Sequence, residues 1–292
     1  MDYRIADFLL RTEGAHSDIV GCGLTSFKPF EVEADSNIEP TMILRMDSDI
    51  DDTSFAITKQ IHAFDFENDY ASGELSRYEE GYRFSMVRNG RTYTLAKSDN
   101  SNIVESNLGE CYESDPSLVR FGIWIMFGIV IAPLGAIAIH SSVAVKEHEA
   151  VLCLGESGTG KSTHTRLWRE HIEGTRLLND DSPIVRIIDG KCIVYGSPWS
   201  GKTHCYVNKC VPARAFMRLS QAPYNKIHRL PALSAIGAIL PSCPPAFAYD
   251  NALQDHICNT VSDIISCTPV FHLECLPDAA AAELSYSTIF GK

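Results

Sequence analysis

A glycine-rich segment, Gly155–Ser162, reads Gly-Glu-Ser-Gly-Thr-Gly-Lys-Ser and directly follows the apolar run 150–154. A loop that wraps its backbone N–H groups around phosphates needs glycine, which allows unusual dihedrals and close approach. In this Walker A pattern, Lys161 reaches the β- and γ-phosphates and the Ser162 hydroxyl coordinates Mg²⁺. The helix expected to begin at Lys161 adds its N-terminal dipole. The predicted nucleotide contacts are Gly155, Glu156, Ser157, Gly158, Thr159, Gly160, Lys161, Ser162 and Thr163.

Two adjacent carboxylates, Asp180 and Asp181, stand eighteen residues after Ser162, at the end of a short predicted strand over 176–178. Ligands of open α/β sheets bind at the carboxyl ends of strands. A phosphate-bound Mg²⁺ needs a carboxylate, and phosphoryl transfer to a hydroxyl is helped by a carboxylate that orients or deprotonates it. Successive strand residues point in opposite directions, so the two acids could divide these roles. An aspartate-rich turn is the alternative interpretation, because Asn-Asp-Asp-Ser-Pro also suits a turn.

Other polar residues have weaker claims to this site. His140 lies on a strand expected over 136–146, and it faces the same pocket if that strand pairs with the loop strand. A single histidine on an apolar strand is more often a core or surface residue. His164 lies either near the phosphates or on the helix surface. The loop 196–202 could close over a nucleotide and bring Lys202 to the phosphates, or it is a packed turn.

Composition limits the class of protein. The 292 residues are 45% hydrophobic, which suits a globular core, and the net charge of −12 argues against a nucleic-acid partner. Ten scattered cysteines show no zinc-site spacing, which favours reduced thiols in a cytoplasmic protein. The N-terminus does not have the pattern of a signal peptide. The uncharged stretch 121–139 is long enough to span a bilayer, but Pro133 and Gly135 interrupt it, and we expect a buried helix at 117–131 and no membrane partner.

The pattern along the chain predicts two regions. Residues 1–112 form a β-rich region of unknown role, in which Asn89-Gly90 joins the strands of a hairpin over 82–87 and 91–95. Residues 113–292 alternate apolar strands with helices and form the predicted α/β catalytic domain. Its expected strands are 136–146, 150–154, 176–178, 184–188, 191–195, 215–219 and 270–275, and its expected helices are 117–131, 161–171, 231–240, 251–266 and 279–286.

Residues 117–290 resemble the catalytic domain of HPr kinase/phosphorylase and the related kinase core of ATP-dependent phosphoenolpyruvate carboxykinase. The resemblance is carried by the loop G-E-S-G-T-G-K-S-T, by His140 fifteen residues before Gly155, and by the pair Asp180-Asp181. The runs L-L-N-D-D-S-P and Y-G-S-P-W-S-G within 176–201 look most like HPr-kinase-related bacterial proteins. The implied fold is a P-loop core, a mixed sheet with flanking helices, preceded by the β-rich region.

The resemblance also implies roles for individual residues. Lys161 and Ser162 are the implied phosphate and metal contacts. Asp180 and Asp181 are the implied metal ligand and hydroxyl-orienting base, and His140 supports the pair. Asp181 is named with Ser162 as a candidate metal ligand, but the sequence does not decide which of the two aspartates is the base. Tyr195–Lys202 replaces the family's glycine-rich signature, which argues against HPr as the acceptor. The arginine and lysine residues with which the carboxykinase binds oxaloacetate are not recognisable in this sequence, which argues against a decarboxylation reaction.

The sequence therefore favours an ATP-dependent kinase that moves the γ-phosphoryl group to a hydroxyl of a peptide, a protein or a small molecule. Its cofactors would be ATP and Mg²⁺, and Mn²⁺ could replace Mg²⁺. The sequence leaves open whether the protein forms a homo-oligomer. Two alternatives remain: a nucleotide-binding regulatory or scaffold protein without transferase activity, and a carboxykinase-like enzyme on a small acid.

Overall fold

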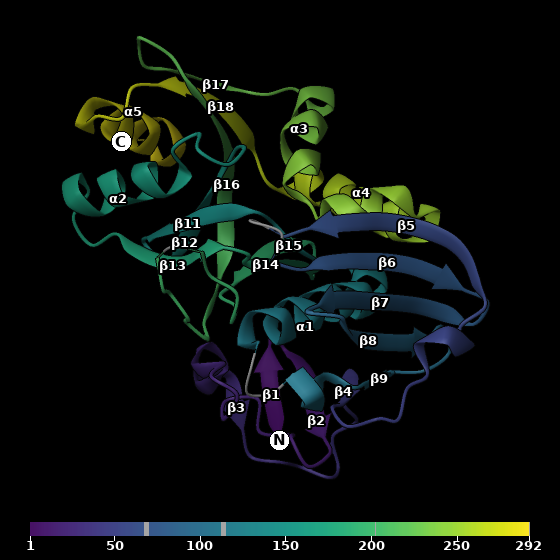
Figure 1. Ribbon diagram of the computed structural model, residues 1–292. Helices are drawn as coiled ribbons and strands as arrows, with labels where there is room; N and C mark the ends of the chain where they lie inside the picture. Colours follow the sequence, from purple (N-terminus) through teal and green to yellow (C-terminus); the bar gives the residue numbers. More distant parts are fainter. Residues whose placement is uncertain (67–69, 112–114, 202, 292) are drawn as a thin grey trace. The chain divides into compact units, whose positions relative to one another are not determined.

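The computed structural model describes residues 1–66, 70–111, 115–201 and 203–291. They form two compact units, Met1–Ile131 with Ala246–Asn251, and Ala132–Pro245 with Ala252–Lys292 (Figure 1). The predicted boundary between residues 112 and 113 lies outside the described residues, as does Lys202. The helix expected over 117–131 belongs by its contacts to the first unit.

The first unit is built on a β-sheet whose strands follow the order β3-β1-β2-β4-β9-β8-β7-β6-β5. In that order the strands are Glu31–Val32, Asp2–Ile5, Phe8–Glu13, Met42–Arg45, Ile103–Ser106, Arg91–Ser98, Gly81–Arg88, Ser72–Tyr78 and Ile57–Asp65. Short 3₁₀ helices cover Thr25–Phe30, Asp52–Ser54, Leu108–Cys111 and Pro245–Tyr249. The predicted hairpin is confirmed as β7 and β8, and Asn89 and Gly90 between them both have positive φ angles, as the tightest hairpin turns require.

One apolar helix, α1 (Pro116–Ile131), packs on this sheet. Its Phe121 ring meets the rings of Phe64 and Phe84 at centroid distances of 5.5 and 5.8 Å. The helix and the 3₁₀ turn that follows, Pro116–Leu134, are long and apolar enough to cross a membrane by length and composition, with 61% of the most apolar window buried in the protein. The helix predicted at 117–131 is therefore present, with most of its apolar surface packed inside the protein.

The second unit is mixed α/β, with helices flanking a mixed sheet in the order β10-β14-β15-β16-β12-β11-β13; β18 also pairs with β16, and β17 pairs with β18. The strands are β10 (Ala136–Ala138), β11 (Ser141–Lys146), β12 (Glu149–Leu154), β13 (Arg176–Asp181), β14 (Ile184–Ile188), β15 (Lys191–Tyr195), β16 (Cys210–Gln221), β17 (Lys226–Arg229) and β18 (Val270–Cys275). The helices are α2 (Lys161–His171), α3 (Ala232–Ile239), α4 (Asn251–Cys267) and α5 (Ala279–Phe290), with 3₁₀ turns at Ala132–Leu134 and Leu240–Ser242. The predicted fold class is confirmed, with the β-rich region ahead of it.

Helices α2 and α5 pack together against one face of this sheet (Figure 1). Their shared core holds Trp168 of α2, Ile289 of α5, and Met217 and Leu219 of β16. Because side chains alternate along a strand, the β16 residue between Met217 and Leu219 points to the opposite face of the sheet. Arg218 therefore lies on the face away from α2 and α5.

The structure corrects two of the predicted strands. The strand expected over 136–146 is two strands, since β10 pairs with β14 whereas β11 lies between β12 and β13. The two residues that connect β10 to β11 are not paired in the sheet. The Ile139 N–H donates to the Pro183 carbonyl, and the His140 N–H donates to the Ser242 carbonyl. The strand expected over 176–178 continues to Asp181, because β13 pairs with β11 along that whole length.

Candidate phosphate-binding site

The glycine-rich segment forms a loop between β12 and α2, as predicted. Gly155, Gly158 and Gly160 have φ angles of 148°, 83° and 106°, in a region that side chains rarely occupy. A Cβ on Gly155 would also lie 2.4 Å from Thr159 Oγ1. Nothing lies within 4 Å of a Cβ built at Gly158 or Gly160. The loop thus has the backbone conformation that needs glycine, with open space beside its last two glycines.

Lys161 begins α2 and turns back over the loop. Its Nζ donates to the carbonyl oxygens of Gly155 and Glu156 at 2.7 and 3.1 Å, and the side chain is nearly buried. Burial lowers the pKa of Lys161, and the nearby charges of Asp181 and Asp180 oppose that shift. The ammonium group therefore lies inside the loop, hydrogen-bonded to two of its carbonyl oxygens.

Asp180 lies against the beginning of α2. Its Oδ1 accepts a hydrogen bond from the Ser162 hydroxyl at 2.8 Å, and the carboxylate is 5% exposed. The register explains this position, because β13 pairs Asp180 with Ser142 of β11, and the Ser142 hydroxyl lies 2.7 Å from that of Thr165 on α2. Strand β13 therefore aims Asp180 at the helix that follows the loop.

Asp181 points to the other face of the sheet and lies 3.1 Å from His140 Nδ1. The side chains of His140 and Asp181 are 46% and 38% exposed, so a solvated acceptor could reach them. His140 stands in the connection between β10 and β11 rather than on a strand, and the antiparallel pairing of β11 with β13 brings it beside Asp181. The predicted carboxylates thus have different partners on different faces.

The segment 196–201 packs against the carboxyl end of β13. The buried Asn179 amide donates to the carbonyls of Ser197 and Trp199 at 3.4 and 3.1 Å, and the Gly201 N–H donates to the Asp180 carbonyl at 2.7 Å. Its described residues therefore form a packed turn that holds the aspartate strand in place.

His164 lies in the core behind the loop, so of the two positions that the sequence left open, the one on the helix surface is excluded. The side chain is 3% exposed, and its Nε2 lies 3.0 Å from the Ser285 hydroxyl and accepts from Trp168 Nε1 at 3.1 Å. Burial lowers the pKa of His164 to about 4, so the ring is neutral at pH 7. Its role in this unit is to pack α2 against α5.

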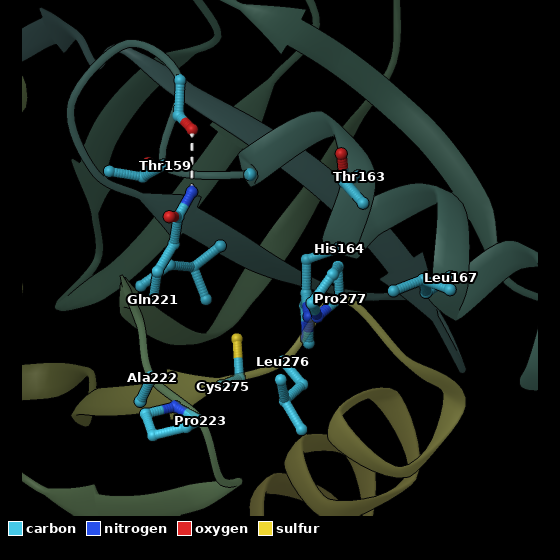
Figure 2. A pocket seen from close by; sticks show the side chains of 13 residues that line it. Thr159, Thr163, His164, Leu167, Gln221, Ala222, Pro223, Cys275, Leu276 and Pro277 are labelled. Atoms are coloured by element: carbon cyan, nitrogen blue, oxygen red, sulfur yellow. Dashed lines mark hydrogen bonds between the residues drawn. The ribbon is translucent and has the colours of Figure 1, made fainter.

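A cavity of about 520 Å³ opens beside the loop on the α2 side of the sheet (Figure 2). It lies between the loop, α2 and the ends of β16 and β18. The lining residues are Gly158, Thr159, Gly160, Thr163, His164, Leu167, Leu219, Gln221, Ala222, Pro223, Cys275, Leu276 and Pro277. The Gln221 amide crosses the cavity to donate to the Gly158 carbonyl at 3.3 Å. A mostly apolar cavity with a few polar groups is typical of a small-molecule site.

The sequence prediction missed two residues near the loop, Gln221 and Arg218. Arg218 Nη2 lies 3.6 Å from the Glu156 carboxylate. Both residues are on β16, more than fifty positions after the loop, and only the parallel pairing of β12 with β16 brings them there. The apolar run 215–219 predicted the strand, but nothing in it indicates which strand it pairs with.

No set of three or more His, Cys, Asp and Glu side chains among the described residues could hold a metal ion. Ser162 and Asp180 would therefore supply a hydroxyl and a carboxylate only. Mg²⁺ at nucleotide sites is usually held by one or two carboxylates with phosphate oxygens and water, and this pair fits that chemistry.

No protein-family model matches the sequence, and a search of curated proteins found no match. Among solved structures, the chain is similar to the Hpr(Ser) kinase/phosphatase from Coxiella burnetii. The two are 13% identical, with a TM-score of 0.31, over 53% of this chain and 94% of that chain. A likeness this low indicates a distant relationship at most, so the assignment of the site rests on its own geometry.

Proposed function

We propose that this protein is an ATP-dependent phosphotransferase that moves the γ-phosphoryl group to a hydroxyl of a peptide, protein or small-molecule acceptor. The observation that carries the proposal is the contact of Ser162 with Asp180 at 2.8 Å beside the glycine loop. A hydroxyl and a buried carboxylate at the first turn of a helix that follows such a loop suit a Mg²⁺–nucleotide complex. The His140–Asp181 pair on the opposite face of the sheet would then supply the acceptor-orienting base that a kinase needs and a simple nucleotide binder does not.

The nucleotide would occupy the loop and the cavity together. The loop N–H groups and Lys161 would hold the phosphates, and Thr163 lies where the loop meets the cavity. The nucleoside would enter the apolar cavity, where Leu219 and Ala222 offer surface to a base and Gln221 offers an amide. The volume of about 520 Å³ is within the range of small-molecule pockets.

The sequence left open which aspartate is the metal ligand and which is the base, and the different partners of the two side chains support one division of these roles. Asp180 would hold Mg²⁺ with Ser162, and the metal would neutralise charge on the β- and γ-phosphates. Asp181, beside His140, would orient the acceptor hydroxyl and take its proton. In the transfer, the bond from the γ-phosphorus to the β,γ-bridging oxygen breaks, a bond to the acceptor oxygen forms, and ADP leaves with the bridging oxygen.

Phosphate release from labelled ATP tests this proposal without knowledge of the acceptor, because water can replace it slowly. We expect Mg²⁺-dependent binding of ATP, and turnover that rises when a pool of peptide and small-molecule hydroxyl acceptors is added. The Lys161→Ala variant should lose nucleotide affinity, and the exposed Lys191→Ala variant on β15 is the matched control. Nucleotide binding without turnover of any acceptor or of water would favour a regulatory protein. Turnover of oxaloacetate would favour a carboxykinase-like enzyme.

A further inference from the structure

Arg218 lies in the same row of paired residues across the sheet as Asp181, the proposed base. The register connects Asp181 to Ser141, Ser141 to Leu154, and Leu154 to Arg218 across strands β13, β11, β12 and β16. Directly paired residues point to the same face, so Asp181 and Arg218 share the face away from α2. They are three inter-strand spacings apart, roughly 14 Å. Leu154, from which the phosphate loop departs, lies between them.

The guanidinium group of Arg218 is held loosely. Its Nη1 donates to the Ala238 carbonyl at 3.3 Å, and its Nη2 lies 3.6 Å from Glu156 Oε1. The Glu156 side chain is 81% exposed, whereas that of Arg218 is 24% exposed. An ion pair with so exposed a partner contributes little free energy, and a phosphate could displace the carboxylate.

We propose that Arg218 contacts the γ-phosphoryl group of bound ATP and stabilises it during transfer, exchanging Glu156 for phosphate oxygens. This inference rests on the proposed function and adds a catalytic residue to it. The planar guanidinium matches two phosphate oxygens at once, which Lys161 cannot do. Arg218 and Asp181 would then flank the reacting group from opposite sides, and the acceptor would approach along the face that they share.

Comparison of two nucleotides isolates the role of Arg218. Isothermal titration with Mg²⁺ would measure binding of ADP and of the β,γ-imido analogue of ATP, which differ in the γ-phosphoryl group. We expect the Arg218→Gln variant to bind the analogue about 10-fold more weakly or worse, the loss typical of a charge-assisted hydrogen bond, and ADP within about 3-fold of wild type. Turnover should fall about 10³-fold, in the range of other transition-state arginines.

Two further variants separate this role from a structural one. Arg214→Gln removes a positive charge from the same strand at a position that contacts Glu149 and the Ile289 carbonyl, and it should change neither affinity. Arg218→Lys keeps the charge and should retain part of the preference for the analogue, with an unchanged melting temperature. Equal losses for ADP and the analogue, or none for either, would overturn the inference and leave the proposed function intact. A wild-type protein that binds neither nucleotide would overturn both.

Discussion

Separate replacement of Asp180 and Asp181 by asparagine should distinguish the residue that supports nucleotide binding from the residue that supports phosphoryl transfer. Asp180 is 5% exposed and bonded to the Ser162 hydroxyl, so its loss removes a buried charge beside the proposed metal. Mutation even of residues that only support a metal ligand typically costs 10- to 100-fold in metal affinity, and we expect Asp180→Asn to weaken Mg²⁺-dependent ATP binding by about 100-fold. Asp181→Asn should leave that affinity within about 3-fold, because its carboxylate faces His140 instead.

Turnover should show the complementary pattern. Loss of general-base assistance typically costs about 10²–10⁴ in rate, so Asp181→Asn should lower kcat by that factor at saturating ATP. The assay is ATP affinity by titration at several Mg²⁺ concentrations, followed by phosphate release under saturation, with melting temperatures to confirm folding. A Mg²⁺-dependent loss of affinity in Asp181→Asn, combined with normal affinity in Asp180→Asn, would refute the assignment and show that the two roles are reversed.

Three more predictions concern the loop, the core and the cavity. Gly155→Ala places a Cβ at a residue with φ 148°, 2.4 Å from Thr159 Oγ1. The resulting backbone strain of about 1–3 kcal/mol disfavours the loop conformation, so nucleotide affinity measured by titration should fall about 5- to 150-fold. Adding Thr159→Ala removes the close contact but not the unfavourable φ, so it should restore only part of the affinity. His164 has a folded pKa of about 4 against 6.5, so stability is complete above pH 6.5 and falls by about 3 kcal/mol as pH drops through 4; urea unfolding should show this dependence in wild type and not in His164→Gln. Ala222→Phe fills the cavity and should weaken ATP but not tripolyphosphate in competition binding; equal effects on both would place the nucleoside elsewhere.

Local signals in the sequence were sufficient for most of the second unit. The glycine loop, the helix from Lys161 and the two strands expected over 184–188 and 191–195 each depend on a few neighbouring residues, and all are present. The break at Ile139-His140 could not be predicted because no glycine or proline marks it. It arises because β10 and β11 pair with different strands, and such pairing depends on residues far along the chain.

The site was predictable in its composition but not in its geometry. Asn179, Asp180 and Asp181 are turn-forming residues by propensity, yet they continue β13 because β11 and the packed segment 196–201 satisfy their backbone and side chains. Their extension of the strand decides which carboxylate faces the loop helix. A turn would leave both orientations open, and this is why the sequence alone did not decide which aspartate is the metal ligand and which is the base.

The alternation of side chains along β13 places the proposed metal ligand and the proposed base on opposite faces of the sheet. One step along the strand takes the chain from Asp180, which faces α2 and the Ser162 hydroxyl, to Asp181, which faces His140. The cavity proposed for the nucleoside lies on the α2 side, whereas Arg218 lies on the side of Asp181. A bound triphosphate would therefore cross the end of the sheet from one face to the other. Only its γ-phosphoryl group would reach the acceptor, so the sheet itself would separate nucleotide binding from acceptor binding.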